Sequence, residues 1–148
     1  MKKVVVVTGA ARGIGLAIAR RFLAGHWGVA MLDIDGVTLA AAARELGSGT
    51  LPIECDVAEP GEVRDAVEQV ARRFGRIDAL VNNAGIAVFK PLLETTYEEW
   101  ARVLAVNLSG PFLCTQACAP VMLEGGGGSV VNIGSISGVR ASTLRVAY

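Results

Sequence analysis

The sequence is poor in the residues that build the common metal and nucleophile sites. His26 is its one histidine, which excludes a Ser-His-Asp triad and a metal site made of several histidines. It follows Gly25 where a helical pattern stops, so we predict a surface position at a helix end. The three cysteines, Cys55, Cys114 and Cys118, form no CxxC pair and have no histidine nearby in the sequence. We therefore predict small buried thiols and no metal site.

A net charge and long apolar runs are also missing. The 14 basic and 14 acidic residues cancel, so no net field draws the chain to nucleic acid or to an anionic membrane. No apolar run approaches the roughly 18 residues that span a bilayer. Met1-Lys2-Lys3 and four valines resemble the start of a signal peptide, but Thr8-Gly9 interrupts them, and a short strand explains the run better. We predict a cytoplasmic protein with no nucleic-acid partner and no membrane partner.

Glycine and apolar side chains are abundant, with 18 glycines and 52% hydrophobic residues in 148. The apolar side chains form short β-type runs that alternate with helical stretches, which is typical of a parallel sheet with helices on both faces. The predicted strands are Val4–Val7, Gly28–Leu32, Thr50–Cys55, Ile77–Val81 and Ser129–Ile133. Because no repeat, linker or second domain is visible, we predict one α/β domain over residues 1–148.

Apolar residues at helical spacing predict the helices between these strands. The first helix carries Ile14, Ile18 and Phe22 on one face, and similar patterns follow within residues 39–46 and 63–74. A long helix is expected around Tyr97–Met122, with a kink near Pro111.

Two strands indicate their own places in the sheet. Val4–Val7 is apolar throughout, as expected of a central strand buried on both faces. Pro52 removes a ladder donor from the third strand, which therefore belongs at an edge. Together they favour a doubly wound sheet with the strand order 3-2-1-4-5.

The segment Thr8–Gly15 joins the first strand to the first helix and holds three glycines. Gly9, Gly13 and Gly15 permit positive φ angles and let the backbone approach a pyrophosphate with no Cβ in the way. A helix that starts near Gly13 points free N–H groups and its positive dipole end at the phosphates. With a buried strand before it and an acid at the end of the next strand, the segment predicts a dinucleotide-binding turn. A purely structural turn is the alternative.

That acid is Asp33, directly after the second predicted strand. Its carboxylate can accept hydrogen bonds from the adenine-ribose hydroxyls and would repel the 2′-phosphate of NADP. A helix N-cap role suits Asp35 better, because Gly36 and Val37 follow it. Arg12 argues the other way, since a guanidinium near the ribose can pair with a 2′-phosphate. We predict NAD as the cofactor, with NADP as the alternative.

The glycine spacing TGxxxGIG resembles that of the short-chain dehydrogenase/reductase family. Four further motifs occur in the family's order, so the resemblance covers essentially the whole chain. They are Asp56-Val57, the segment Asn82–Gly85, Asn107, and the pair Ser135 and Tyr148. The resemblance implies a Rossmann fold. It also implies cofactor-binding roles for Gly9, Arg12, Gly13, Ile14, Gly15, Asp33, Asp56, Val57, Asn83, Ala84 and Gly85, and catalytic roles for Asn107, Ser135 and Tyr148.

Several of these residues have plainer alternatives. Asp56 either accepts from the adenine amino group, as the resemblance implies, or caps the helix that Pro60 introduces. Ser135 either polarises a substrate carbonyl or is a turn serine. Asn107 supports a proton relay by resemblance, but its position alone suggests a satisfied core asparagine. That position is on an apolar stripe made of Trp100, Val103, Leu104 and Leu108.

The resemblance implies hydride transfer between NAD(H) and a secondary alcohol or ketone. Tyr148 would be the acid/base, Ser135 would orient the substrate oxygen, and Asn107 would support the relay. A free tyrosine has a pKa near 10, and the family lowers it with a lysine four residues later, beyond Tyr148. We therefore predict that residues 1–148 are the N-terminal part of a longer enzyme that forms a homodimer or homotetramer.

Alone, these residues should bind the cofactor with little turnover. One alternative is a non-catalytic NAD-binding module or an incomplete subunit. Another is a methyltransferase on a similar sheet, because those enzymes also use glycines after the first strand and an acid after the second.

Overall fold

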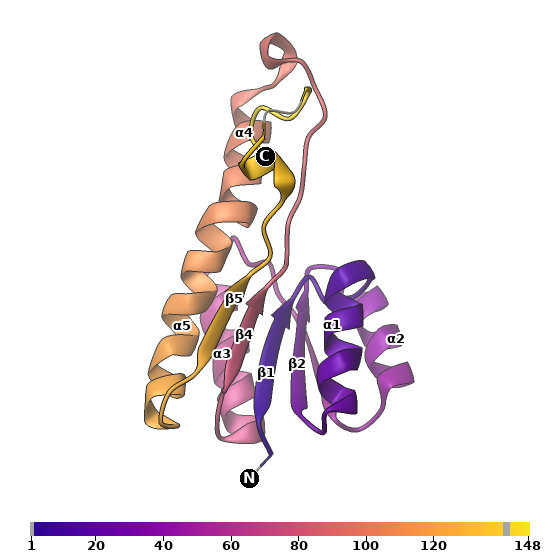
Figure 1. Ribbon diagram of the computed structural model, residues 1–148, viewed down its shortest axis with the longest axis vertical. Helices are drawn as coiled ribbons and strands as arrows, with labels where there is room; N and C mark the ends of the chain where they lie inside the picture. Colours follow the sequence, from indigo (N-terminus) through magenta and orange to yellow (C-terminus); the bar gives the residue numbers. More distant parts are fainter. Residues whose placement is uncertain (1, 141–142) are drawn as a thin grey trace.

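Five parallel strands form one sheet in this computed structural model, which describes residues 2–140 and 143–148. The strands are β1 (Val4–Thr8), β2 (Gly28–Asp33), β3 (Thr50–Glu54), β4 (Ala79–Asn82) and β5 (Ser129–Asn132). Their order is β3-β2-β1-β4-β5, as predicted (Figure 1). This doubly wound α/β arrangement is a Rossmann-like fold.

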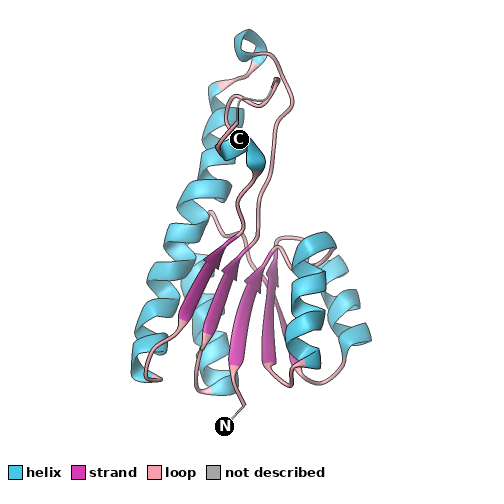
Figure 2. Cartoon of the chain, viewed as in Figure 1, coloured by secondary structure: helices cyan, strands magenta, loops and turns pink. Residues whose placement is uncertain are grey.

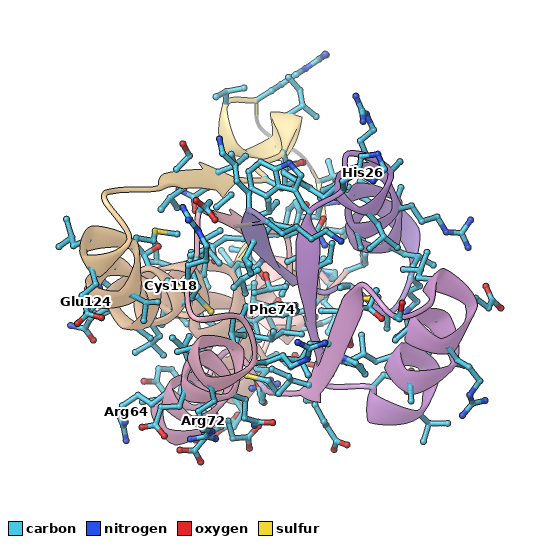
Figure 3. All side chains as sticks on the ribbon, turned by 90° about the horizontal axis from the view of Figure 1, so that it is seen from below. His26, Arg64, Arg72, Phe74, Cys118 and Glu124 are labelled. Atoms are coloured by element: carbon cyan, nitrogen blue, oxygen red, sulfur yellow. The ribbon has the colours of Figure 1, made fainter. Side chains whose placement is uncertain are left out.

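Helices cover both faces of the sheet (Figure 2). They are α1 (Gly13–Ala24), α2 (Gly36–Leu46), α3 (Pro60–Phe74), α4 (Tyr97–Leu104) and α5 (Gly110–Glu124). Seen from below, α1 and α2 lie on one side of the strands and α3 and α5 on the other (Figure 3). Short 3-10 turns lie at Leu92–Glu94 and Ile136–Gly138, and a π-helical turn at Ala105–Ser109 joins α4 to α5.

The two layers of helices create two apolar cores, and alternate residues of each central strand enter them. Val4 and Val6 of β1 pack with residues of α3 and α5, whereas Val5 and Val7 pack with residues of α2 and with Ala19 of α1. All five residues of β1 are buried. A strand covered on both faces needs apolar side chains at every position, which is why Val4–Val7 is an unbroken run.

The predicted edge position of β3 is confirmed, because this strand pairs with β2 alone and places Pro52 opposite Met31. β5 forms the other edge and pairs with β4. The two edges therefore leave β1 in the centre, where its carboxyl end faces the segments that follow β2 and β4.

The long helix predicted around Tyr97–Met122 is interrupted by one π-helical turn at Ala105–Ser109. The interruption precedes Pro111, in the first turn of α5. Proline has no N–H for the carbonyl four residues earlier, which here is that of Asn107. A π turn is a frequent feature of functional sites, and this one holds Asn107 itself.

The three thiols are buried and unbonded, as predicted. Burial raises the pKa of Cys55, Cys114 and Cys118 to about 12. His26 lies exposed just after α1, with a φ of 63°. In residues 2–140 and 143–148 there is no group of histidine, cysteine and acidic side chains able to hold a metal, and no helix there has the length and apolar character to cross a bilayer.

Candidate functional site

Two adjoining clefts open along the carboxyl ends of the strands. The first has a volume of about 250 Å³ and the second about 740 Å³. The segment that follows β4, residues 83–86, lines both of them and forms their common wall. Ligands of doubly wound sheets bind at this edge, so an elongated ligand has room on both sides of the wall.

Most of the residues predicted to form the site line one of these clefts. The first cleft is lined by Gly9, Arg12, Asp33, Asp56 and Val57, and the second by Ile14, Asn107, Ser135 and Tyr148, while Asn83, Ala84 and Gly85 line both. Gly13 and Gly15 line neither cleft. Both lie in the first turn of α1, directly after the segment whose Gly9 and Arg12 line the first cleft.

Glycine is required in this turn by close backbone approaches. A Cβ on Gly15 would lie 2.1 Å from the carbonyl oxygen of Gly9, which no real contact allows. Gly9 has a φ of +64°, and a Cβ there would lie 2.9 Å from the Cα of Ala84. The glycines therefore allow the turn after β1, the start of α1 and the segment after β4 to pack backbone against backbone.

The beginning of α1 has no side-chain cap. By contrast, α2 is capped by Asp35, which accepts from the N–H of Thr38, and α4 is capped by Thr96. The first N–H groups of a helix need acceptors and carry the positive end of the helix dipole. Those of α1 are therefore available to an anion in the cleft.

Ile14 corrects one prediction about α1. We expected it on the buried face with Ile18 and Phe22, but its side chain is 65% exposed and lines the second cleft. The buried positions of this helix are Gly15 and Ala19. The helix packs on its small residues because the turn before it approaches the sheet so closely.

Asp33 connects the turn after β1 to the end of β2. Its two carboxylate oxygens accept from the N–H of Ala11 at 2.9 Å and from that of Asp35 at 3.0 Å. The capping role assigned to Asp35 is confirmed. Arg12 lies 3.8 Å from the Asp35 carboxylate with its side chain 74% exposed. The lining of the first cleft thus includes a carboxylate held by two backbone N–H groups, that of Asp33, and an exposed guanidinium, that of Arg12.

Asp56 has partners that the sequence did not reveal. One carboxylate oxygen accepts from the N–H of Ala58, and the other pairs with Nη2 of Arg102 at 2.7 Å. The helix-capping alternative is wrong, because α3 begins at an N-cap, Glu59, that has no side-chain cap bond. Arg102 comes from α4 and also lines the first cleft, so this pair fixes the Asp56 carboxylate at the cleft wall.

The common wall is fastened to β1 by Thr8 and Asn83. The Thr8 hydroxyl oxygen accepts from the N–H groups of Asn83 and Ala84, each at 3.0 Å. The Asn83 amide donates back to the carbonyls of Thr8 and Gly9. Because Thr8 is buried, these bonds are shielded from water and hold the wall at a fixed height above the glycine turn.

Asn107 binds the other end of the wall. Its Oδ1 accepts from the N–H of Ile86 at 2.9 Å, and its Nδ2 donates to the Ile86 carbonyl at 2.8 Å. Asn107 is a satisfied asparagine, as the alternative held, but it is half-buried and not in the core. The predicted apolar stripe is wrong in part, because Trp100 is 38% and Leu108 67% exposed.

Ser135, Tyr148 and Asn107 all line the second cleft. Ser135 follows β5 and its Oγ accepts from the N–H of Ser137. Residues 143–148 run beside the loop after β4, since the N–H of Lys90 donates to the carbonyl of Leu144. In Figure 1 both segments rise above the carboxyl ends of the strands. Three residues from distant parts of the chain thus line one cleft.

Comparisons with known proteins agree with this geometry. A family model described as short chain dehydrogenase matches residues 3–148. The chain is 43% identical to a D-threitol dehydrogenase of Mycolicibacterium smegmatis, over 99% of this chain and 57% of that protein. It is also 43% identical to a 2-(R)-hydroxypropyl-CoM dehydrogenase of Xanthobacter autotrophicus, over 100% of this chain and 62% of that protein.

A solved structure is similar as well. The 3-ketoacyl-(acyl-carrier-protein) reductase of Brucella melitensis, crystallised with NADH, matches with a TM-score of 0.94 and 31% identity, over 99% of this chain and 62% of that one. The chain thus spans little more than half the length of the relatives that it matches.

Proposed function

The chain belongs to the short-chain dehydrogenase family of oxidoreductases, and from this we propose that it binds NAD(H) across the two clefts and oxidises a secondary alcohol or reduces a ketone. The observation that carries the proposal is the common wall. Residues 83–86 lie between two clefts. The first adjoins the uncapped N-terminus of α1 and contains the Asp33 carboxylate, and the second is lined by Asn107, Ser135 and Tyr148. A dinucleotide is long enough to occupy the first cleft and present its reactive end in the second.

The first cleft fits the phosphate and adenosine half of such a cofactor. The space kept open by Gly9 and Gly15 and the uncapped N-terminus of α1 suit the pyrophosphate. Asp33 would accept from the ribose hydroxyls, and Asp56 with Val57 would contact the adenine. The structural neighbour's NADH supports a nicotinamide cofactor, and the Asp33 carboxylate is our reason for preferring NAD to NADP.

In the second cleft, the nicotinamide would supply or accept the hydride, and the protein would handle the proton. Tyr148 would exchange a proton with the substrate oxygen, while the Ser135 hydroxyl would hold that oxygen by a hydrogen bond. Asn107 would support the proton relay and, through its two bonds to Ile86, would keep the wall beside the nicotinamide in place. The family match leaves the methyltransferase alternative without support.

Fluorescence titration with NADH and NADPH, paired with a turnover assay on secondary alcohols and ketones, tests the proposal. We expect NADH to bind about tenfold more tightly than NADPH. Tyr148→Phe should bind NADH within about threefold of the wild type and, in the longer enzyme that we predict to contain residues 1–148, should lose at least about 100-fold in turnover. Failure of both cofactors to bind would overturn the proposal. NADH binding without turnover in any form of the protein would favour the non-catalytic module.

We also propose a cytoplasmic homodimer or homotetramer. The support for self-association is the exposed apolar side chains of the π turn and α5, where Leu108, Phe112 and Leu123 are each more than 60% exposed. Exposed apolar side chains of this size mark interaction surfaces when they cluster. Sedimentation of the wild type and of Phe112→Glu should show a larger species only for the wild type, whereas equal sedimentation would contradict this interface.

A further inference from the structure

Among the described residues, the lining of the second cleft holds one charged side chain, that of Arg145. The other described lining residues are apolar, glycine, amide or hydroxyl residues. The cation comes from the segment that carries Tyr148, three residues earlier in the chain. The described lining of the cleft therefore supplies no negatively charged side chain to pair with Arg145.

The guanidinium of Arg145 is held in place from two sides. Its Nη1 donates to the Ser137 hydroxyl at 3.1 Å, and its Cζ lies 4.7 Å from the centroid of the Phe89 ring. The ring of Tyr148 lies 5.9 Å away. Two aromatic faces orient the planar group without neutralising it, so its position is fixed while its charge is intact.

The charge of Arg145 has no protein partner among the described residues, since no carboxylate there lies within 4.0 Å of it. Another half-buried cation, Arg76, pairs with Asp78, and the more exposed Arg102 pairs with Asp56. The neighbouring Lys90 is paired with Glu99. Desolvating a charge without a partner is unfavourable, and a ligand that brings an anion removes that penalty.

We propose that Arg145 binds an anionic oxygen group, a carboxylate or a sulfonate, on the substrate. The inference rests on the proposed function, because it places this group beside the oxygen that Ser135 and Tyr148 would contact. The guanidinium fork matches two oxygens of such a group, and Ser137 and Phe89 position the fork. The substrate class is therefore a hydroxy or oxo acid, rather than a neutral polyol.

Binding of short oxo acids and their neutral amides provides the test. The acids are pyruvate, 3-oxobutanoate and 4-oxopentanoate, which vary the distance between ketone and carboxylate, and 2-oxopropane-1-sulfonate is the sulfonate arm. Dissociation constants are measured calorimetrically with and without NADH, on the wild type, Arg145→Gln and Arg145→Lys. Arg140→Gln is the matched control, because Arg140 is exposed, lies in the same segment and does not line the cleft.

The wild type should bind one oxo acid at least about tenfold more tightly than its amide, which corresponds to one charge-assisted hydrogen-bonded pair. Arg145→Gln should remove this preference and leave amide binding within about threefold, while Arg145→Lys should keep part of it. Arg140→Gln should behave as the wild type. Preference for the sulfonate over every carboxylate would identify the sulfonate as the anion.

Equal binding of acid and amide by the wild type would overturn the proposal. So would an equal loss of acid and amide binding in Arg145→Gln, because Arg145 would then only support the cleft. If NADH does not bind but the acid preference depends on Arg145, the anion site stands and the proposed hydride transfer fails. Circular dichroism of each variant separates these results from misfolding.

Discussion

β1 and β5 are both valine-rich strands that pair with β4, yet their surroundings are opposite. All five residues of β1 are buried, and all four of β5 are exposed. β1 lies between two strands and two helical layers, whereas β5 is an edge. Beside it, a groove of about 440 Å³ lies over β4 and β5, lined by Trp27, Ser129 and Val131 among others.

The difference shows that an apolar run predicts a strand but not its burial. Burial depends on what the fold places on each face, and the groove marks a face of β5 that no described helix covers. The same division applies to the site. In the first cleft, Gly9 and residues 83–86 directly follow the buried strands β1 and β4, while Ser135 and Tyr148 of the second belong to the segment that follows the exposed strand β5.

The largest effect is expected of Gly15→Ala, which tests the turn after the buried strand β1. The added Cβ would collide with the Gly9 carbonyl and displace the turn after β1. We expect NADH binding to weaken by at least about 100-fold in a fluorescence titration. Gly61→Ala in α3 is the control, because a Cβ there meets nothing within 4 Å and should leave binding unchanged. Wild-type affinity in Gly15→Ala would show that the turn is not the phosphate site.

Two valine-to-alanine substitutions, one in β1 and one in β5, measure how much the burial of each strand contributes to the free energy of unfolding. Val6→Ala removes two methyl groups from a side chain that is 1% exposed, and should lower the free energy of unfolding by about 2 kcal/mol. Val131→Ala changes a side chain that is 47% exposed, and should lower it by less than about 1 kcal/mol. Urea denaturation gives both values. Equal losses would mean that β5 is covered in solution.

Asp33→Asn tests the carboxylate at the end of β2. The amide keeps an acceptor for the N–H of Ala11 or Asp35 but removes the negative charge. We expect the ratio of NADPH to NADH affinity to rise by about tenfold, because the repulsion of a 2′-phosphate is lost. Parallel titrations with both cofactors measure the ratio. An unchanged ratio would remove the argument for NAD.

The smallest expected effect is a pH dependence at the other end of β1. Asp78 accepts from the N–H of Val4 and pairs with Arg76, and the hydrogen bond from Arg76 lowers the pKa of Asp78 below its ordinary value of 3.8. A lowered folded-state pKa stabilises the protein fully above the unfolded value, and this stabilisation is lost as the pH falls through the folded value.

Urea denaturation between pH 6 and pH 3 should therefore show a steeper loss of stability for the wild type than for Asp78→Asn, with the difference confined to the acid end (about pH 4 and below). Asp65→Asn, which removes an exposed carboxyl of α3, should follow the wild-type curve. A slope that is the same in wild type and Asp78→Asn would exclude Asp78 as a pH-sensitive anchor of β1.

The fold was predictable from the sequence because single residues determine the places of whole strands. Pro52 predicted that the third strand lies at an edge, and the apolar run Val4–Val7 predicted that the first strand lies in the centre. The predicted strand order is the one observed. Boundaries differ by one or two residues. The fourth strand was predicted from Ile77 but begins at Ala79, because Ile77 is buried by packing just before the ladder starts.

The site was predictable where motifs adjoin the strands, and not where partners come from afar. The capping by Asp35 is local and was predicted. The pair between Asp56 and Arg102 spans 46 positions, and the contacts of Arg145 with Phe89 need two segments to fold together. The spacing of residues in the sequence does not predict contacts between segments this far apart. The π turn around Asn107 was missed because only Pro111, and not the register shift, is visible in the sequence.

The burial of the three thiols has a practical consequence. With a pKa of about 12, each sulfur is protonated at neutral pH, and alkylating reagents attack the thiolate. The native cysteines should therefore not react with maleimides while the protein is folded. A single introduced cysteine, for instance Val131→Cys on the open face of β5, becomes a selective attachment point for a fluorophore or spin label, and none of the three native cysteines has to be replaced.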